Sequence, residues 1–364
     1  MATDPQNLDV EKIEATVKHV FGMLGGAVVS GMIYLGDRLG LYRALAGAGP
    51  VTSEELATKT GLHERWVREW LRGQAAAGII DYAGQHAGQD RFSLSPEGAM
   101  VLAEEQSPAF AAGGFGGLPA QMAVLEKLPE AFKTGVGLPY DVFGTEGNRG
   151  VERMFAPWFR TMLVPVALPA LDGVQTKLEA GAKVADVGCG AGVALIEMAK
   201  AFPGSQFHGY EISEHALALA NTNKQEAGLA NLTFHDARTD PMASDASFDL
   251  ITTFDCLHDM AHPAPVMRAI RQAIKPDGTW LIADIKSKPT FEENLRDNPM
   301  ASMMYGFSVL SCMSSALSEP DGAGLGTLGF TEDVARTMTS DAGFTRFQPR
   351  DFDHPMNAYY EVRP

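Results

Sequence analysis

Four closely spaced residues, Asp186, Gly188, Gly190 and Gly192, form the part of the sequence with the clearest chemical meaning. The apolar run before Asp186 predicts a strand, and the run after Gly192 predicts a helix. Alternating glycines let a backbone turn tightly and approach a ligand without obstruction by side chains. In open parallel sheets, ligands bind outside the carboxyl ends of the strands. We therefore expect a ligand site at this junction of strand, loop and helix.

The spacing of these glycines excludes two phosphate-binding motifs. The dinucleotide fingerprint G-x-G-x-x-G requires a third glycine. Counted from Gly188 that position is Val193, and counted from Gly190 it is Leu195. The P-loop pattern G-x-x-x-x-G-K-[ST] does not occur either. The loop must therefore serve another kind of ligand.

The elements around this loop alternate between strands and helices from about residue 182 onward, which predicts a parallel, doubly wound sheet. Two strand-like runs at 345–352 and 357–364 are close enough to form an antiparallel hairpin at the sheet edge. The strands are expected at 182–188, 206–212, 231–237, 247–255 and 278–285, followed by these two. This part of the chain is therefore of the α/β class.

The ordered motifs of this region resemble the class I S-adenosylmethionine-dependent methyltransferases. The segment DVGCGAG is similar to their first motif, and Glu211 ends the second strand 19 positions after Gly192. The resemblance implies that Asp186 lies near the methionine ammonium, that Glu211 holds the ribose hydroxyls and that Asp236 contacts the adenine amine. It implies S-adenosyl-L-methionine as cofactor, S-adenosyl-L-homocysteine as product, and a cofactor-binding set of Asp186, Gly188, Gly190, Gly192, Glu211, Asp236, Ala237 and Phe254.

A histidine after the fourth strand is the candidate general base. The segment CLHDM around His258 resembles the LHDW segment of small-molecule O-methyltransferases, which implies a catalytic role for His258 and Asp259. An imidazole titrates near neutrality and can accept a hydroxyl proton. Asp255 or Asp259 is expected to orient the ring. The sequence departs from the family at Met260, and Ala261–Ala264 replaces an acidic pair, so a purely structural role for His258 stays open.

Two other chemistries are weaker at the same segment. His258 and His262 are four residues apart, as in a metal pair, but Pro263 and the lack of a third ligand argue against it, and we expect no metal. Cys256 as a nucleophile has no better support than a buried or loop thiol.

The region 52–94 has the pattern of a winged helix-turn-helix. A helix start at Thr52 or Ser53, a break at Thr60-Gly61 and a second helix over about 64–77 precede two short strands at 79–82 and 91–94. The second helix carries Arg65, Arg68 and Arg72 but also Glu64 and Glu69, a mixed charge that argues against DNA binding. In the small-molecule O-methyltransferases that combine these two parts, this module dimerises and contributes to the substrate pocket.

The first helix, expected over about the first 30 residues, has apolar residues at three- and four-residue steps. Glycines follow within the apolar stretch, including Gly25, Gly26 and Gly31. A buried core helix and a dimer interface both fit this pattern. The expected organisation is a winged-helix-like dimerisation domain at 1–105, a helical connector at 106–175 that contributes to the substrate pocket, and a cofactor-binding domain at 176–364.

Methionines cluster at 99–127, at 152–163 together with aromatic residues, and at 300–313, three regions that line the acceptor site in the O-methyltransferases. Since Met is flexible and polarisable, it suits an adaptable apolar pocket, although ordinary core packing also fits. We expect an apolar cavity between the N-terminal helices, the 151–162 helix and the 300–313 segment. The candidate pocket residues are Met154, Phe155, Trp158, Met162, Met303, Met304 and Phe307.

Length and composition limit the number of domains and the classes of partner. The 364 residues favour two domains. The 29 basic and 45 acidic residues give a net charge of -16, which makes nucleic acid an unfavourable partner. Three cysteines indicate a reducing cytoplasm rather than a disulfide framework. The N-terminus has no signal-peptide pattern, and no uninterrupted apolar run approaches the roughly 18–20 residues of a membrane span.

The sequence thus predicts a Rossmann-like, seven-stranded methyltransferase sheet with a mainly helical N-terminal winged-helix domain. The expected activity is methyl transfer to a small apolar or aromatic acceptor, preferably to oxygen, by a cytoplasmic homodimer joined through its N-terminal helices. Methylation of N, S or C stays open. The alternatives are a cofactor-sensing transcriptional regulator and a methyltransferase fold adapted to other chemistry.

Overall fold

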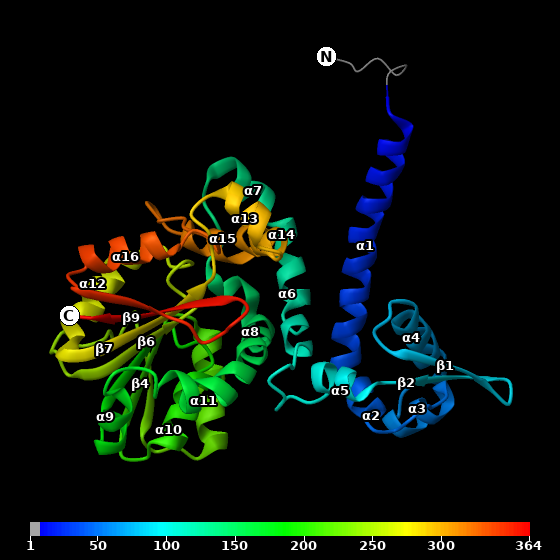
Figure 1. The fold of residues 1–364 in the computed structure, drawn as a ribbon, viewed down its shortest axis with the longest axis horizontal. Helices are drawn as coiled ribbons and strands as arrows, with labels where there is room; N and C mark the ends of the chain where they lie inside the picture. Colours follow the sequence, from blue (N-terminus) through cyan, green and yellow to red (C-terminus); the bar gives the residue numbers. More distant parts are fainter. Residues whose placement is uncertain (1–7) are drawn as a thin grey trace. The chain divides into compact units, whose positions relative to one another are not determined.

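The computed structural model of the protein describes residues 8–364, which form two compact units. The first extends to Leu118 and the second comprises Pro119–Pro364 (Figure 1). Residues 1–7 lie outside the described part, so the prediction that the N-terminus has no signal-peptide pattern falls partly on residues whose structure is not described.

The first unit contains the predicted winged helix-turn-helix. Thr52 caps α3 in a capping box with Glu55, and Gly61 ends that helix at a φ of 70°. The core of the first unit contains side chains that are almost fully buried, among them Tyr42, Leu45, Leu71 and Phe92. The elements are α1 (Val10–Arg38), α2 (Leu41–Leu45), α3 (Ser53–Thr60), α4 (Glu64–Ala76), β1 (Asp81–His86), β2 (Gln89–Ser93), α5 (Pro96–Leu102) and η2 (Ala112–Phe115).

Helix α1 is largely exposed. Only Ile33, Gly36 and Asp37 are buried, so the interpretation of α1 as a buried core helix is wrong for most of its length. Gly36 marks the point of close packing, because a Cβ there would lie 2.5 Å from the Trp70 ring of α4. By length and composition alone, α1 could cross a membrane, although it contains no uninterrupted apolar run of that length. Core helices and N-terminal signal sequences have the same length and composition, so this property does not identify a membrane span.

The second unit is built on a seven-stranded sheet in the order β5-β4-β3-β6-β7-β9-β8. The first five strands are parallel, and β9 pairs antiparallel with both β7 and β8. This confirms the predicted α/β sheet and its terminal hairpin. The strands are β3 (Lys183–Val187), β4 (Gln206–Glu211), β5 (Leu232–Asp236), β6 (Phe248–Phe254), β7 (Ile274–Ile285), β8 (Arg346–Arg350) and β9 (Asn357–Arg363).

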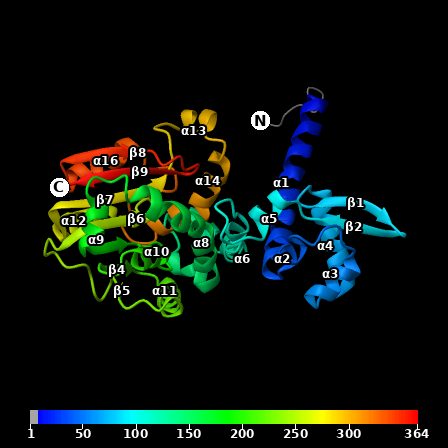
Figure 2. The same cartoon turned by 60° about the horizontal axis from the view of Figure 1, so that its bottom comes forward.

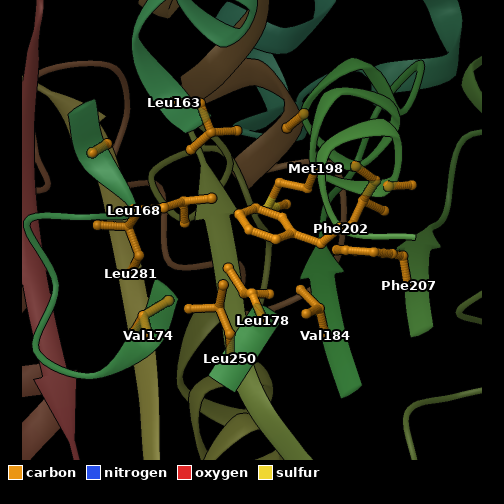
Figure 3. Close-up of a cluster of buried hydrophobic side chains, with 14 of the residues drawn as sticks. Leu163, Leu168, Val174, Leu178, Val184, Met198, Phe202, Phe207, Leu250 and Leu281 are labelled. Carbon is orange, nitrogen blue, oxygen red and sulfur yellow. The ribbon is translucent and has the colours of Figure 1, made fainter. Parts of the chain in front are cut away.

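Helices cover both faces of this sheet (Figures 1 and 2). On one face, α9 (Val174–Ala180) and α10 (Val193–Ala201) pack against the strands, with α11 (Glu214–Ala227) beside α10. Figure 3 shows the apolar side chains there, with Phe202 and Leu178 among residues from β3, β6 and β7. On the other face, α12 (Pro263–Ala273) and α16 (Glu332–Asp341) enclose a second core around Trp280.

The remaining helical segments precede β3 or follow β7 in the chain. Pro157 lies in α8 and Pro165 in the π-helical η5. Proline has no N–H to donate, and π-type turns accommodate such an interruption. These segments are α6 (Leu118–Ala123), η3 (Val124–Glu126), α7 (Leu128–Thr134), η4 (Tyr140–Phe143), α8 (Gly144–Trp158), η5 (Phe159–Ala167), α13 (Phe291–Asp297), α14 (Ala301–Phe307), η6 (Ser308–Cys312) and α15 (Met313–Ala316).

Candidate active site

A cavity of about 400 Å³ lies in the second unit at the carboxyl ends of β3, β4 and β6. Its lining includes the whole loop from Asp186 to Ala194, together with Glu211 of β4 and Phe254 of β6. Residues of η4, α8 and η5 contribute Tyr140, Phe155 and Phe159. The cavity therefore occupies the position at which an open α/β sheet binds its ligand.

The glycine loop is shaped by its contacts with the neighbouring strands. The N–H of Gly188 donates to the carbonyl of Tyr210 at 2.8 Å. Gly188 has a φ of 73°, and a Cβ there would lie 2.8 Å from the Sγ of Cys256. A Cβ on Gly192 would lie 2.3 Å from the ring of Phe234, whereas one on Gly190 would meet no atom within 4 Å. The first and last glycines thus let the loop pack closely, and Gly190 leaves open space toward a ligand.

Glu211 ties this loop to β4. Its Oε2 accepts from the N–H of Gly190 at 2.9 Å, and its Oε1 accepts from the N–H groups of Ile212 and Ser213 at 2.7 and 2.9 Å. Burial raises the pKa of Glu211, although these backbone donors lower it. Oε1 already accepts from two N–H groups, whereas Oε2 accepts from one, so Oε2 keeps a lone pair for a ligand hydroxyl.

Asp186 is buried at the end of β3, where it accepts a hydrogen bond from Thr252 Oγ1 at 2.7 Å. Burial raises its pKa to about 8, and Thr252 opposes this effect. A cation beside a buried carboxyl favours the ionised form. A ligand ammonium or sulfonium group would therefore suit this end of the cavity.

The predicted adenine contact, Asp236, is not among the residues that line the cavity. Its carboxylate is held by Arg238, whose Nε and Nη2 donate to it at 2.9 Å each. The arginine also lowers the pKa of Asp236. The neighbouring Ala237 does line the cavity.

His258 is only 3% exposed and does not line the cavity, although its chain neighbours Cys256, Asp259 and Met260 do. Its Nδ1 lies 2.6 Å from Oδ1 of Asp284, at the end of β7. Burial by itself lowers the pKa of His258, but the charge of Asp284 and hydrogen bonds with Asp284 and Cys312 outweigh it and raise that pKa.

The acid that orients His258 is therefore Asp284, and not Asp255 or Asp259 as expected. Strands β6 and β7 are neighbours in the sheet, so residues 26 positions apart meet at their carboxyl ends. An acid at the end of a predicted parallel strand was the available signal in the sequence. Asp255 instead accepts from Nδ2 of Asn357 in β9.

Asp255 and Asp259 both line the cavity. Burial raises the pKa of Asp259 to about 7 and that of Asp255 to about 8. Asp255 also has a φ of 50°, which is unusual for a residue with a side chain. No sequence pattern predicts the remaining polar lining groups, which include Tyr140, Glu152 and Glu319.

The candidate pocket residues are divided between several places. Phe155 lines the cavity, next to Phe159 and Phe254, whose rings are 5.0 Å apart. Trp158 stacks on Tyr359 with ring centres 5.1 Å apart. Met304 packs in a separate cluster with Ile285 and Leu328. Met154, Trp158, Met162, Met303, Met304 and Phe307 are not among the lining residues.

The arginines of α4 are each paired within the first unit. Arg65 pairs with Glu69, Arg68 with Glu64 at 3.1 Å, and Arg72 with Asp90 of β2 at 2.8 Å. Such pairs offset the positive charge that a phosphate backbone requires. A DNA-binding regulator is therefore not favoured. Within residues 8–364 no group of three or more His, Cys, Asp or Glu side chains is placed to hold a metal ion.

Comparison with known proteins agrees with this architecture. Residues 178–343 match the model of a methyltransferase domain, and residues 27–104 match that of an Rv2258c-like winged HTH domain. The ubiquinone biosynthesis O-methyltransferase of Leptothrix cholodnii is 28% identical over 127 residues, which cover 34% of this chain and 53% of that protein. The chain thus spans about half the length of this curated relative.

Two solved structures resemble nearly the whole chain. Mitomycin 7-O-methyltransferase is 20% identical with a TM-score of 0.67, and the match covers 98% of this chain and 100% of that one. Human N-acetylserotonin methyltransferase, solved with S-adenosylmethionine, is 16% identical with a TM-score of 0.69, covering 100% and 99%.

The second unit therefore has the fold of the class I S-adenosylmethionine-dependent methyltransferases. The chain thus combines a methyltransferase domain with an N-terminal winged HTH domain.

Proposed function

We propose that this protein transfers a methyl group from S-adenosylmethionine to an oxygen of a small apolar or aromatic acceptor. The observation that carries the proposal is the 400 Å³ cavity, in which the glycine loop, Asp186 and Glu211 converge at the ends of adjacent strands. The residues fit the cofactor, since Gly190 leaves open space and two buried acids suit hydroxyl and cationic groups.

In this proposal Asp186 binds the ammonium group of the cofactor, Glu211 its ribose hydroxyls, and Ala237 and Phe254 the rest of the adenosine. Asp236 could contact the adenine only after its carboxylate had given up its hydrogen bonds with Arg238. When bound, the cofactor supplies an electrophilic sulfonium methyl group, which the acceptor oxygen takes as it loses its proton, leaving a neutral thioether.

The protein's own task is to hold the acceptor and accept its proton. Asp284 fixes one proton of His258 on Nδ1 and leaves Nε2 as the acceptor when the ring is neutral. We propose His258 as the general base. Asp259, which lines the cavity, is the second catalytic residue of this proposal.

The same proposal includes the assembly and location of the protein. The winged-helix domain, 1–105, serves as the dimerisation module of a homodimer, through α1. The connector 106–175 contributes to the substrate pocket, as Val151 and Phe155 indicate, and 176–364 binds the cofactor. The three cysteines, which form no disulfide, support a cytoplasmic location.

Calorimetry with S-adenosylhomocysteine tests the cofactor assignment. We expect micromolar binding and at least a tenfold loss in Glu211→Gln, because the variant has one acceptor oxygen in place of two. The control is Glu214→Gln, an exposed acid at the start of α11 that lies outside the cavity. Absence of binding at millimolar ligand would overturn the proposed function.

A further inference from the structure

The charges lining the cavity are strongly one-sided. Among its described lining residues are six acids and no Lys or Arg, and His262 is the one basic side chain. The acids are Glu152, Asp186, Glu211, Asp255, Asp259 and Glu319. A ligand that adds negative charge is therefore disfavoured, and a cationic ligand is favoured.

Five of these acids belong to the proposed cofactor end or have a polar side chain as partner, and Asp255 is one of them through Asn357. Asp186 and Glu211 belong to the proposed cofactor end. Glu152 accepts from Nδ2 of Asn223 at 2.8 Å, and Glu319 lies 3.3 Å from Nε2 of His262. Asp255 and Asp259 both line the cavity and flank His258 in the chain, so we assign these two acids to the acceptor end.

These two acids lack a cationic partner other than buried His258. Asp255 has the neutral amide of Asn357, and Asp259 forms no ion pair within residues 8–364. Ionised carboxyl groups are costly to bury without an opposite charge. Their raised pKa values, about 8 and about 7, express that cost. A ligand cation would remove it.

The aromatic lining independently favours the same kind of ligand. Tyr140 and Phe159 contribute rings to the cavity. Burial raises the pKa of Tyr140, and the charge of nearby Asp259 raises it further. Aromatic faces attract ammonium groups, most strongly where water is excluded. A cation between carboxyl groups and rings is a common arrangement for binding organic amines.

We propose that the acceptor is a small aromatic amine in its protonated form, whose ammonium group binds at Asp259 and Asp255 and whose ring carries the hydroxyl to be methylated. This inference rests on the proposed function. A protonated amine has no lone pair, so its nitrogen is protected while the hydroxyl oxygen reacts. The oxygen–methyl bond forms as the sulfonium–methyl bond breaks, and the hydroxyl proton passes to His258.

The test compares three phenols that differ mainly in charge. Tyramine is cationic, 4-ethylphenol is neutral and 3-(4-hydroxyphenyl)propionate is anionic. Each is titrated by calorimetry into the full-length protein saturated with S-adenosylhomocysteine. We expect tyramine to bind at least tenfold more tightly than 4-ethylphenol, and the anion not to bind. At pH 7 tyramine binding should also release protons, seen as a dependence of the heat on the buffer.

Two variants localise the effect. Asp259→Asn should weaken tyramine at least tenfold and leave 4-ethylphenol within about twofold. The matched control is Glu152→Gln, an acid of the same cavity that already has a neutral partner, and it should leave the preference unchanged. Equal affinity for the amine and the neutral phenol, preference for the anion, or no binding of any of the three would overturn the inference.

The two proposals fail in distinguishable ways. If S-adenosylhomocysteine does not bind, the proposed function fails before any phenol is added. If it binds and the charge preference is absent, the proposed function stands and the assignment of an amine acceptor is wrong. Circular dichroism of Asp259→Asn shows whether a loss of binding reflects unfolding instead.

Discussion

Asp284 gives His258 a property that its position in the chain does not reveal. The carboxylate lies 2.6 Å from Nδ1 and raises the pKa of the imidazole despite burial. A base must be neutral to accept a proton, so a raised pKa moves the active form to higher pH. We therefore expect kcat/KM to rise with pH from 6 upward, through the pKa of His258.

Nuclear magnetic resonance titration of the histidine ring nitrogens tests this directly. His258 should titrate above its usual value of about 6.5. In Asp284→Asn the charge is removed and burial dominates, so the pKa of His258 should fall and the activity profile should shift to lower pH. Titration of the wild-type ring below 6.5, or no shift in Asp284→Asn, would contradict the assignment. His258→Ala should lower turnover at least 100-fold while cofactor affinity stays near normal.

Short sequence motifs predicted the cofactor end of the site but could not predict the contact between His258 and Asp284. The glycine loop, Asp186 and Glu211 are recognisable because each lies at a strand end within a short motif. The contact between His258 and Asp284 depends on which strands are neighbours, which no local pattern encodes. Met304 fits a pocket and a core equally well by spacing, and it packs with Ile285 in a core cluster.

At the scale of elements, the packing of α1 on α4 depends on one glycine. A Cβ at Gly36 would lie 2.5 Å from Trp70 and 2.6 Å from Tyr42, two rings held in the core. Gly36→Ala should therefore destabilise the protein by about 1–3 kcal/mol through overpacking. Gly73→Ala, at an exposed position of α4 with no atom within 4 Å of the added Cβ, should stabilise the protein by up to about 1 kcal/mol.

Thermal unfolding followed by circular dichroism measures both variants. The contrast between them separates a packing effect from the general preference of helices for alanine. An equal change in melting temperature for Gly36→Ala and Gly73→Ala would show that the α1–α4 contact is not close in solution.

At the scale of the molecule, α1 exposes an apolar surface that a second copy would cover. Val17, Phe21 and Leu24 are each at least half exposed, and they recur at the spacing of one helix face. We expect light scattering after size exclusion to give about twice the chain mass of 39.0 kDa. Phe21→Glu combined with Leu24→Glu should give the monomer mass, because charge at a buried interface is costly.

The control for the dimer is Trp66→Glu. Trp66 is 79% exposed on α4, so its substitution should leave the mass unchanged if α1 forms the interface. A monomeric wild-type protein would show that this surface has another role, and sedimentation with lipid vesicles would then test the membrane alternative that the composition of α1 allows.

The position of β9 has a consequence for the order in which the protein is completed. This strand is the last in the sequence, yet it lies between β7 and β8, and its Asn357 holds Asp255 of the cavity. During synthesis, the ribosome must release nearly all of the described chain before the sheet can close. A nascent polypeptide that has formed the glycine loop would therefore still have an incomplete acceptor end until β9 has emerged and paired with β7.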